Sequence, residues 1–379
     1  MSAAPRVLFA GGGTGGHLYP ALNLADAFRR ADPRSEVYFI GAQRGVEARV
    51  LPEKGVPNAL LPLEPLRRAR PWENWKLVPS FFGAMAGLGK AHRDFRPNLV
   101  VGTGGYASGL AVFHGWRRGI PVALQEQNSF PGLVTRTMAK RARQLHLAFP
   151  EARKYLKPGA RTEIFEFGNP ITPPNFSVDR AAARARFGLG DGTVCLVVGG
   201  SQGARTVNEA LLSEIRGVVE GRTEAPPAGF EILWATGPAH FDGIQARLGE
   251  MGRPAWVKAV AYIQDMPGAL ASADLAVSRA GAMALAELCA WGIPSILVPL
   301  PTAAANHQYH NAVALSDAGA AVLVEETQLG TGRLGGEIVA LARDPARRAG
   351  LSAKARERGR PDAADRIVEQ LLRLIEQKS

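Results

Sequence analysis

Apolar residues gather along the chain in short runs, and helix-length stretches of mixed polarity separate these runs. In the first half the runs cover residues 7–10, 37–40, 99–101, 122–124 and 145–147. Runs of this kind, with helical stretches between them, are typical of βαβ units and predict a mostly parallel sheet. In the second half the pattern starts again, with runs at 194–198, 232–235, 275–277 and 296–298. The pattern therefore predicts an α/β protein with two Rossmann-like halves.

A proline-rich passage, Asn169-Pro170-Ile171-Thr172-Pro173-Pro174, separates the halves and indicates a linker. A chain of 379 residues is long enough for roughly two domains. The segment 362–378 places apolar residues on one helical face, namely Ile367, Leu371, Leu374 and Ile375. We expect an N-terminal domain over 1–167, a C-terminal domain over 168–356, and a final helix over about 357–379 that packs back on the N-terminal domain.

Each half carries a glycine-rich turn directly after an apolar run. The first is Gly11-Gly12-Gly13-Thr14-Gly15-Gly16-His17, which leads into a helix-like segment at 20–30. The second covers 199–204, and a third glycine cluster covers 102–106. Glycines between a strand and a helix let backbone N–H groups approach an anion, and the helix dipole adds to the attraction. The turns therefore predict phosphate sites beyond the carboxyl ends of the strands.

The first turn fits the dinucleotide pattern G-x-G-x-x-G, but its surroundings argue against two common nucleotide sites. A nicotinamide site needs an acidic residue at the end of the next strand, where this chain has Gly41-Ala42-Gln43. A phosphate-loop NTPase needs Lys and then Ser or Thr after Gly16, where His17 and Leu18 stand. What remains is a phosphate cradle with an imidazole at its edge, a group that accepts protons near pH 7.

Composition and charge narrow the class of protein. No apolar stretch reaches the roughly 18–20 residues of a spanning helix, and the first residues do not resemble a signal peptide. Cys195 and Cys289 predict neither a disulfide framework nor a metal cluster, which fits a reducing cytosol. The net charge of +11 favours an anionic partner, unless an arginine-rich genome has biased the surface. A nucleic-acid-binding protein would share this charge, but the chain has no zinc finger, helix-turn-helix or aromatic RNA-binding motif.

An aromatic and basic segment follows the first two apolar runs. If it is helical, one face carries its aromatic residues and a methionine, namely Trp72, Trp75, Phe82 and Met85. Basic residues flank them at 67, 68, 70 and 90, and Trp116 with Arg117 and Arg118 extends the set. Aromatic side chains among cations are typical of a peripheral membrane contact, where each basic residue near anionic lipid contributes roughly 1 kcal/mol. A packing face between helices would have the same spacing.

Seven motifs occur in an order that resembles the MurG family of peptidoglycan transferases. They are Gly12-Gly13-Thr14-Gly15-Gly16-His17, Gly104-Gly105-Tyr106, Glu126-Gln127-Asn128, Gly168-Asn169-Pro170, Gly200-Ser201-Gln202-Gly203-Ala204, Arg279-Ala280-Gly281-Ala282, and His307-Gln308 with Asn311. The resemblance covers nearly the whole chain. It implies a GT-B fold, in which two Rossmann-like domains with parallel sheets face each other across a cleft. It also implies an inverting transfer of N-acetylglucosamine from UDP-GlcNAc to the 4-hydroxyl of MurNAc in undecaprenyl-diphospho-MurNAc-pentapeptide (lipid I), which gives lipid II.

The resemblance places the UDP-GlcNAc donor in the C-terminal domain. It implies that the diphosphate lies on the turn with Ser201, that Glu287 binds the ribose hydroxyls, and that Tyr262 lies beside the uracil. The other implied donor residues are Gln202, Gly203, Ile263, Ala282, Met283, His307, Gln308 and Asn311. No Cys, Asp or Glu stands near His307 and His310 at ligand spacing, so no metal site is expected.

On the acceptor side the resemblance implies the binding residues Thr14, Gly15, Gly16, Tyr106 and Glu126 and the catalytic residues His17 and Asn128. His17 is either the general base or a donor to the lipid diphosphate. Asn128 orients the acceptor sugar or the base, and Glu126 is equally compatible with an internally satisfied carboxylate. One position departs from the family, which commonly has an arginine where this chain has Thr172. Either Arg205 or another basic side chain replaces that charge, or donor affinity is weaker.

The resemblance also implies where the protein acts and with what. Besides UDP-GlcNAc and lipid I, the implied partners are anionic lipids of the cytoplasmic leaflet, on which the protein would be peripheral, at the bacterial inner membrane. Contacts with other cell-wall synthesis and division proteins stay open, and nucleic acid is not expected. No cofactor is required, while stimulation by a divalent cation stays open. The alternative is another GT-B enzyme, a UDP-GlcNAc 2-epimerase or a lipid glucosyltransferase, and the aromatic segment argues against a soluble epimerase.

Overall fold

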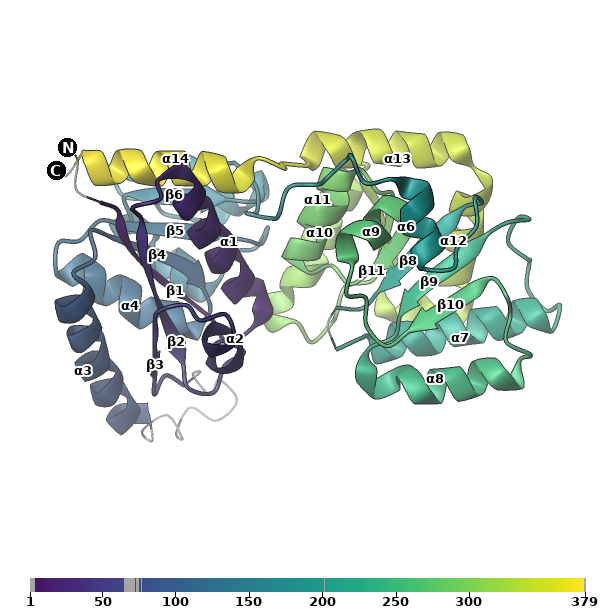
Figure 1. Cartoon of the computed structure of the whole chain (residues 1–379), viewed down its shortest axis with the longest axis horizontal. Helices are drawn as coiled ribbons and strands as arrows, with labels where there is room; N and C mark the ends of the chain where they lie inside the picture. The colour runs from purple at the N-terminus through teal and green to yellow at the C-terminus, as the bar shows by residue number, and fades with distance from the viewer. Residues whose placement is uncertain (1–3, 65–71, 73–74, 76, 201, 378–379) are drawn as a thin grey trace. The chain divides into compact units, whose positions relative to one another are not determined.

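The computed structural model describes residues 4–64, 72, 75, 77–200 and 202–377. The chain divides into two compact units, one formed by residues 1–172 with 361–379 and the other by residues 173–360. In each unit the described strands form a parallel sheet with helices packed on its two faces (Figure 1). The predicted α/β class with two parallel, Rossmann-like sheets is confirmed.

The sheet of the first unit has the strand order β3-β2-β1-β4-β5-β6-β7. Its strands are β1 (Arg6–Gly11), β2 (Glu36–Ala42), β3 (Asn58–Leu61), β4 (Leu99–Gly104), β5 (Val122–Glu126), β6 (Gln144–Leu147) and β7 (Glu163–Phe165). Its helices are α1 (Gly15–Ala31), α2 (Glu47–Glu53), α3 (Leu77–Phe95), α4 (Tyr106–Arg117), α5 (Leu133–Met138) and α14 (Ala363–Glu376). Short 3-10 segments lie at Ala139–Arg141 and Pro150–Tyr155.

Strand β1 is buried on both faces, so its side chains alternate between two apolar cores. Val7 and Phe9 belong to a core that includes residues of α1 and α14, whereas Leu8 and Ala10 belong to one that includes residues of α3 and α4. Helix α14 packs against α1 (Figure 1). The apolar face of α14 is buried in the first core through Ile367, Leu371, Leu374 and Ile375. The end of the chain therefore completes a core that the beginning of the chain starts.

The second unit repeats this arrangement with the strand order β10-β9-β8-β11-β12-β13. Its strands are β8 (Val194–Val198), β9 (Glu231–Ala235), β10 (Val257–Val260), β11 (Leu275–Ser278), β12 (Ser295–Leu297) and β13 (Ala321–Leu323). Its helices are α6 (Arg180–Arg186), α7 (Arg205–Val219), α8 (Pro238–Glu250), α9 (Met266–Ser272), α10 (Ala282–Trp291), α11 (His307–Asp317), α12 (Arg333–Arg343) and α13 (Pro345–Arg358). The 3-10 segments η4 (Ala304–Asn306) and η5 (Glu326–Thr331) complete it.

Each sheet reverses its winding direction beside the strand that opens the unit. Strand β1 lies between β2 and β4, and β8 lies between β9 and β11. Ligands of open parallel sheets bind beyond the carboxyl ends of the strands at such a switch point. The glycine-rich turns after β1, β4 and β8 lie at these two switch points, so each unit has a candidate ligand site there.

Four short strands, β3, β7, β10 and β13, were not predicted from the sequence. They form the outer edges of the two sheets. The predicted run at 296–298 is strand β12, which begins and ends one residue earlier. The central strands were all found because both of their faces are buried.

Candidate functional site

The glycine-rich turns after β1 and β4 pack directly on one another. A Cβ atom added at Gly105 would lie 2.1 Å from the carbonyl oxygen of Gly12, and one added at Gly104 would lie 2.8 Å from Nδ1 of His17. Both Gly104 and Gly105 have positive φ, at 96° and 75°. Only glycine fits such close approach in this conformation. The two turns therefore form one continuous surface that includes His17.

The imidazole of His17 has one nitrogen held and one open. Its Nδ1 lies 2.9 Å from Oε1 of Gln127 and 3.2 Å from the carbonyl oxygen of Thr103. The Gln127 amide is itself oriented, because its Nε2 donates to the carbonyl oxygens of Thr103 and Gln125. Both neighbours of Nδ1 are thus acceptors, so in the neutral ring Nδ1 carries the proton and Nε2 keeps its lone pair. No described residue bonds to Nε2, which leaves it ready to accept a proton from a ligand.

Glu126 and Asn128 lie at the end of β5 and on the turn that follows it. The buried Glu126 carboxylate accepts from the Asn128 N–H at 3.1 Å, from the Asn128 side-chain amide at 3.3 Å and from the Gly132 N–H at 3.0 Å. Both of its oxygens are engaged inside the protein. Glu126 therefore shapes this turn, and Asn128 is the side chain that it holds in place.

The predicted acceptor residues Thr14, Gly15 and Gly16 lie where α1 begins. Thr14 occupies the N-cap position, but its exposed hydroxyl makes no capping bond. The N–H groups of Gly15 and Gly16 have no acceptor among the described residues, as is usual in the first turn of a helix. The Gly13 N–H, in contrast, already donates to the carboxylate of Glu47. The donors open to a ligand are thus those at the start of α1.

The Tyr106 side chain is half-buried beside this surface. A Cβ atom added at Gly13 would lie 2.7 Å from Cε1 of Tyr106, so the ring lies against the turn. Burial, and then the charges of Glu47 and Glu64, raise the pKa of the Tyr106 hydroxyl above its ordinary value. The hydroxyl therefore stays protonated and can donate a hydrogen bond.

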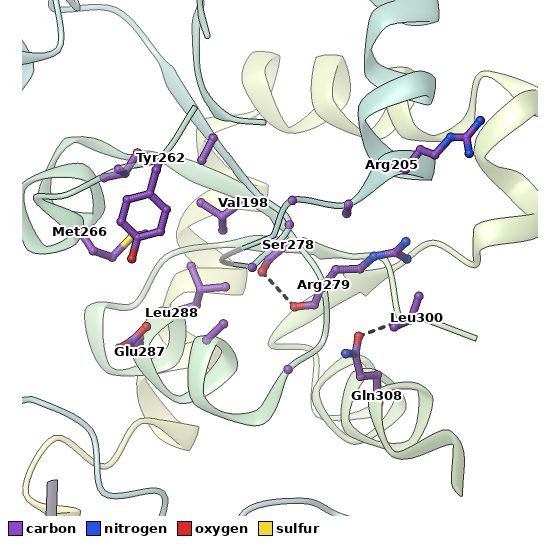
Figure 2. Close-up of a pocket in the computed structure, with 18 of the residues that line it drawn as sticks. Val198, Arg205, Tyr262, Met266, Ser278, Arg279, Glu287, Leu288, Leu300 and Gln308 are labelled. Carbon is purple, nitrogen blue, oxygen red and sulfur yellow. Dashed lines mark hydrogen bonds between the residues drawn. The ribbon is translucent and has the colours of Figure 1, made fainter. Parts of the chain in front are cut away.

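A cavity of about 510 Å³ opens at the switch point of the second unit (Figure 2). Five of the predicted donor residues line it: Gly203, Tyr262, Ile263, Glu287 and Gln308. Figure 2 shows Tyr262 and Met266 at one end of the cavity and the guanidinium groups of Arg205 and Arg279 at the other. One end is thus suited to a flat apolar group and the other to an anion.

Glu287 lines this cavity from α10. Burial raises the pKa of its carboxyl to about 7. No described residue donates a hydrogen bond to it. A desolvated carboxylate without internal donors gains most from donors that a ligand brings, such as paired hydroxyl groups.

Arg279 is a cavity residue that the sequence analysis did not single out as a site residue. Its guanidinium lies 2.6 Å from Oε2 of Glu326 and donates to the Thr206 hydroxyl at 2.7 Å. It also donates to the carbonyl oxygens of Val298 at 3.1 Å and Pro299 at 3.2 Å. Arg279 thereby ties the start of α7, the turn after β12 and η5 together around the cavity. The available signal was its place directly after β11 within the motif that contains Gly281.

The other predicted donor residues do not line the cavity, or lie outside the described residues. Ser201 is outside the described residues. The lining does not include Gln202, Ala282, Met283, His307 or Asn311. Asn311 is fully buried and donates to the carbonyl oxygen of Ala280 at 3.2 Å, so it supports the turn after β11. Arg205, a candidate replacement for the arginine missing at Thr172, is exposed and lines the cavity.

The described residues contain no group of three or more His, Cys, Asp or Glu side chains arranged to hold a metal ion. Cys195 and Cys289 are buried in different elements and are free thiols. The chemistry available at both switch points is therefore that of backbone N–H groups, imidazole, carboxylate and guanidinium.

Exposed aromatic side chains gather before and within α3. The exposed fractions are 71% for Trp72, 69% for Trp75 and 67% for Phe82, whereas Met85 is half-buried. Trp116 on α4 is 39% exposed, and the Arg141 guanidinium lies 4.9 Å from the centre of one of its rings. The basic positions 67, 68 and 70 lie outside the described residues. Among the helices described, none has the length and apolar content needed to cross a bilayer.

Two family models match the chain. Residues 7–147 match the glycosyltransferase family 28 N-terminal domain, and residues 194–367 match the glycosyltransferase family 28 C-terminal domain. The first match covers the glycine-rich turns after β1 and β4. The second covers every residue that lines the cavity.

Relatives match over nearly their full length. A protein of Moorella thermoacetica is 39% identical over 379 residues, which cover 98% of this chain and 99% of the relative. A protein of Acetivibrio thermocellus is 35% identical over 375 residues, which cover 99% of each chain. Both bear the name UDP-N-acetylglucosamine--N-acetylmuramyl-(pentapeptide) pyrophosphoryl-undecaprenol N-acetylglucosamine transferase.

Solved structures show the same architecture. The crystal structure of Acinetobacter baumannii MurG aligns with a TM-score of 0.74 at 25% identity and covers 97% of this chain and 99% of that one. A putative UDP-N-acetylglucosamine 2-epimerase from Listeria monocytogenes aligns with a TM-score of 0.65 at 16% identity, over 97% of this chain and 95% of that one. The second likeness is one of fold alone.

Proposed function

The chain belongs to the MurG family within glycosyltransferase family 28, and on this basis we propose that it transfers N-acetylglucosamine from UDP-GlcNAc to the 4-hydroxyl of MurNAc in lipid I. The product is lipid II, the disaccharide precursor of peptidoglycan. The observation that carries the proposal is similarity over the full length to relatives of that name, at 35% and 39% identity. The protein is a GT-B N-acetylglucosaminyltransferase. Its residues support acceptor binding by the first unit and donor binding by the second.

In this proposal the first unit binds the acceptor and His17 is the general base. The 4-hydroxyl gives its proton to Nε2 while its oxygen attacks C1 of the donor sugar from the face opposite UDP, which inverts that centre. The contacts at Nδ1 support this role over that of a diphosphate donor. Gln127 and Thr103 both accept from Nδ1–H, so they orient the neutral ring and stabilise the imidazolium that forms.

Acceptor binding falls to the residues around His17. The open N–H groups of Gly15 and Gly16 and the Thr14 hydroxyl would bind oxygens of the lipid diphosphate. The Tyr106 hydroxyl is protonated and would donate to the same ligand. Asn128, held by Glu126, would orient the sugar.

The second unit binds the donor and stabilises its leaving group. The diphosphate would lie at the cationic end of the cavity, where Arg205 and the turn after β8 provide positive charge and N–H groups (Figure 2). Negative charge gathers on this diphosphate as the bond to the sugar breaks, and one lost donor of this kind costs on the order of 3 kcal/mol. Glu287 would accept from the two ribose hydroxyls, and Tyr262 would cover the uracil. Arg205 would thus replace the charge that Thr172 cannot supply.

The acceptor is carried on a polyprenyl chain, so the protein must reach a membrane surface. We assign this contact to the exposed aromatic side chains Trp72, Trp75, Phe82 and Trp116, with Met85 at their border. Lys140 and Arg141 stand near Trp116 in the same basic region. The protein would be peripheral on the cytoplasmic leaflet. No protein-held metal or cofactor takes part in the proposed reaction.

The test uses the purified full-length protein, UDP-GlcNAc and a short-chain lipid I analogue. We expect a disaccharide product, and we expect His17→Ala to lower kcat roughly 10²- to 10⁴-fold without changing the Kd for UDP. A 2-epimerase would instead form UDP-N-acetylmannosamine without any acceptor, and a lipid glucosyltransferase would prefer UDP-glucose. Either result, without lipid II formation, would overturn the proposal. Full activity of His17→Ala would remove His17 as the base.

A further inference from the structure

We infer that Glu47 is a positioning residue for the acceptor site, because its carboxylate serves as a built-in anion that holds the glycine-rich turn after β1. The turn has donors that an external phosphate could use, and the protein satisfies one of them itself. The inference rests on the proposed function in one respect, since it assigns the turn to the acceptor. Glu47 touches neither substrate and acts through the backbone of Gly13.

The contacts of Glu47 are made with backbone N–H groups. The Gly13 N–H lies 3.0 Å from Oε1 and 2.9 Å from Oε2, and the Ala42 N–H lies 2.9 Å from Oε1. The side chain is fully buried, although it begins α2 near the surface. No described cation forms an ion pair with it. A buried carboxylate without such compensation would be costly, so these N–H groups are what allow it to stay.

Three glycines make room for this one side chain. An added Cβ would lie 2.2 Å from Oε1 of Glu47 at Gly12, 2.5 Å from its Cγ at Gly41, and 2.2 Å from its Cδ at Gly45. These glycines belong to the turn after β1, to strand β2 and to the segment before α2. The absence of a side chain at these three positions thus leaves a space that the Glu47 carboxylate fills.

The conformation of the turn follows from this contact. Gly13 has a φ of 85°, a conformation that favours glycine, and its N–H donates to the carboxylate. The Tyr106 ring lies against Gly13, and the Gly12 carbonyl lies against Gly105. Movement of Gly13 would therefore shift the surfaces that carry Tyr106 and His17. Glu47 fixes where these two groups stand relative to each other.

The same contact limits where the acceptor's diphosphate can bind. Gly13 cannot donate to it, so the diphosphate is left with the donors of Thr14, Gly15 and Gly16. The fixed negative charge below the turn also opposes a second anion placed deeply in it. The turn thus holds the diphosphate at its rim, next to His17, rather than in its centre.

The experiment compares Glu47→Gln with the wild type and with the matched control Glu53→Gln, an exposed glutamate on the same helix. The Gln amide keeps one acceptor oxygen but turns NH₂ toward a backbone N–H. We expect kcat/KM for the lipid I analogue to fall roughly 10- to 100-fold, with a higher KM because the diphosphate donors and Tyr106 shift, while the Kd for UDP stays unchanged. Hydrogen exchange should accelerate in residues 11–17 and not in residues 202–210. Glu53→Gln should match the wild type.

Two outcomes separate the inference from simpler explanations. If Glu47 only stabilises the fold, Glu47→Gln will lower the Tm while the folded protein keeps the wild-type KM for the acceptor, and the inference is then wrong. If Glu47→Gln does not fold, Glu47→Asp keeps the charge on a side chain one methylene shorter and should raise the same KM by a smaller factor. An unchanged KM in Glu47→Asp would also overturn it. Failure of the wild type to form lipid II would instead overturn the proposed function.

Discussion

His17 and Glu287 are both titratable side chains at a switch point, but their surroundings prepare them differently. His17 is already hydrogen-bonded through Nδ1, so its remaining nitrogen is oriented before any ligand arrives. Glu287 has no described donor, and burial raises the pKa of its carboxyl to about 7. The His17 imidazole is thus oriented in the free protein. The ionised Glu287 carboxylate, in contrast, is desolvated without hydrogen-bond donors, and a ligand can supply these donors.

Glu287→Gln should therefore raise stability and weaken donor binding. The ordinary pKa of 4.5 is raised to about 7 in the folded protein. Ionisation is harder in the folded state, so the carboxyl costs stability as the pH rises above 4.5, and the full cost, at most about 3 kcal/mol, is present above pH 7. In urea unfolding we expect the variant to be more stable than the wild type at pH 8 and equal to it at pH 4.

The same carboxyl gives donor binding a pH dependence. Ribose hydroxyls need the ionised carboxylate as acceptor, so the affinity of the wild type for UDP should rise with pH through about 7. Calorimetric titration of Glu287→Gln should show weaker binding with a flatter pH profile. A variant less stable than the wild type at pH 8 would contradict this account of Glu287.

The position of a site residue could be predicted from the sequence where the residues of a single motif determine that position. The place of His17 follows from the glycines before it, but its tautomer depends on Gln127, which lies 110 positions away. Glu47 gave no signal, because nothing in its own segment shows that a glycine 34 positions earlier donates to it. Contacts of this kind arise only when the sheet brings its strand ends together.

At the scale of elements, prediction failed at the edges of the sheets. The strands β3, β7, β10 and β13 are three or four residues long and lie at the outside of their sheets. An edge strand pairs on one side only and keeps part of its surface in contact with solvent, and β7 and β10 accordingly carry a charged residue, Glu163 and Lys258. The strands β3 and β13 are apolar over three residues each, and runs this short are a weak signal by themselves. The central strands, buried on both faces, were predicted to within a few residues.

Arg279 shows how elements that frame the donor cavity depend on one another. Arg279→Ala would leave Glu326 with the Thr206 hydroxyl but without its ion-pair partner, and would leave two carbonyl oxygens without the Arg279 donor. We expect a loss of about 2–4 kcal/mol in the free energy of unfolding, since one partner of a largely buried pair is removed. Binding of UDP should weaken as well, because the start of α7 is released.

A double-mutant cycle in urea identifies the cause. Glu326→Gln alone should cost less, because the Arg279 guanidinium keeps its other acceptors. The double variant should be less destabilised than the sum of the two single variants. Strict additivity would mean that the pair does not couple these elements.

At the scale of the whole molecule, the sequence repeats one topology. The strand order of the second sheet is that of the first without its last strand. This repeat could be predicted because each half begins with an apolar strand and a glycine-rich turn. The apolar face of the last helix predicted that this helix packs back on the N-terminal domain, and the first unit includes residues 361–379.

Binding to a membrane surface depends on the whole molecule, through its net charge of +11 and the exposed aromatic residues around α3. Trp75→Ala combined with Phe82→Ala should lower partitioning onto vesicles rich in anionic lipid by roughly a hundredfold or more, since each side chain loses about 1.5–3 kcal/mol of apolar burial. Phe176→Ala is the control, because Phe176 is 62% exposed and lies in the other unit. Added salt should weaken binding of the wild type. Equal partitioning of the double variant, with an unchanged circular dichroism spectrum, would exclude this surface.

The return of α14 to α1 has a consequence for biosynthesis. Val7, Phe9 and Phe28 share a core with Ile367 and Leu371, so the first unit lacks part of its covering until the ribosome has synthesised α14. The intervening unit is about 190 residues long, so at roughly 5–20 residues per second this delay lasts on the order of 10–40 s. During that interval the apolar residues of α1 that α14 later covers are exposed on the nascent protein. We therefore expect ribosome-associated chaperones to bind it.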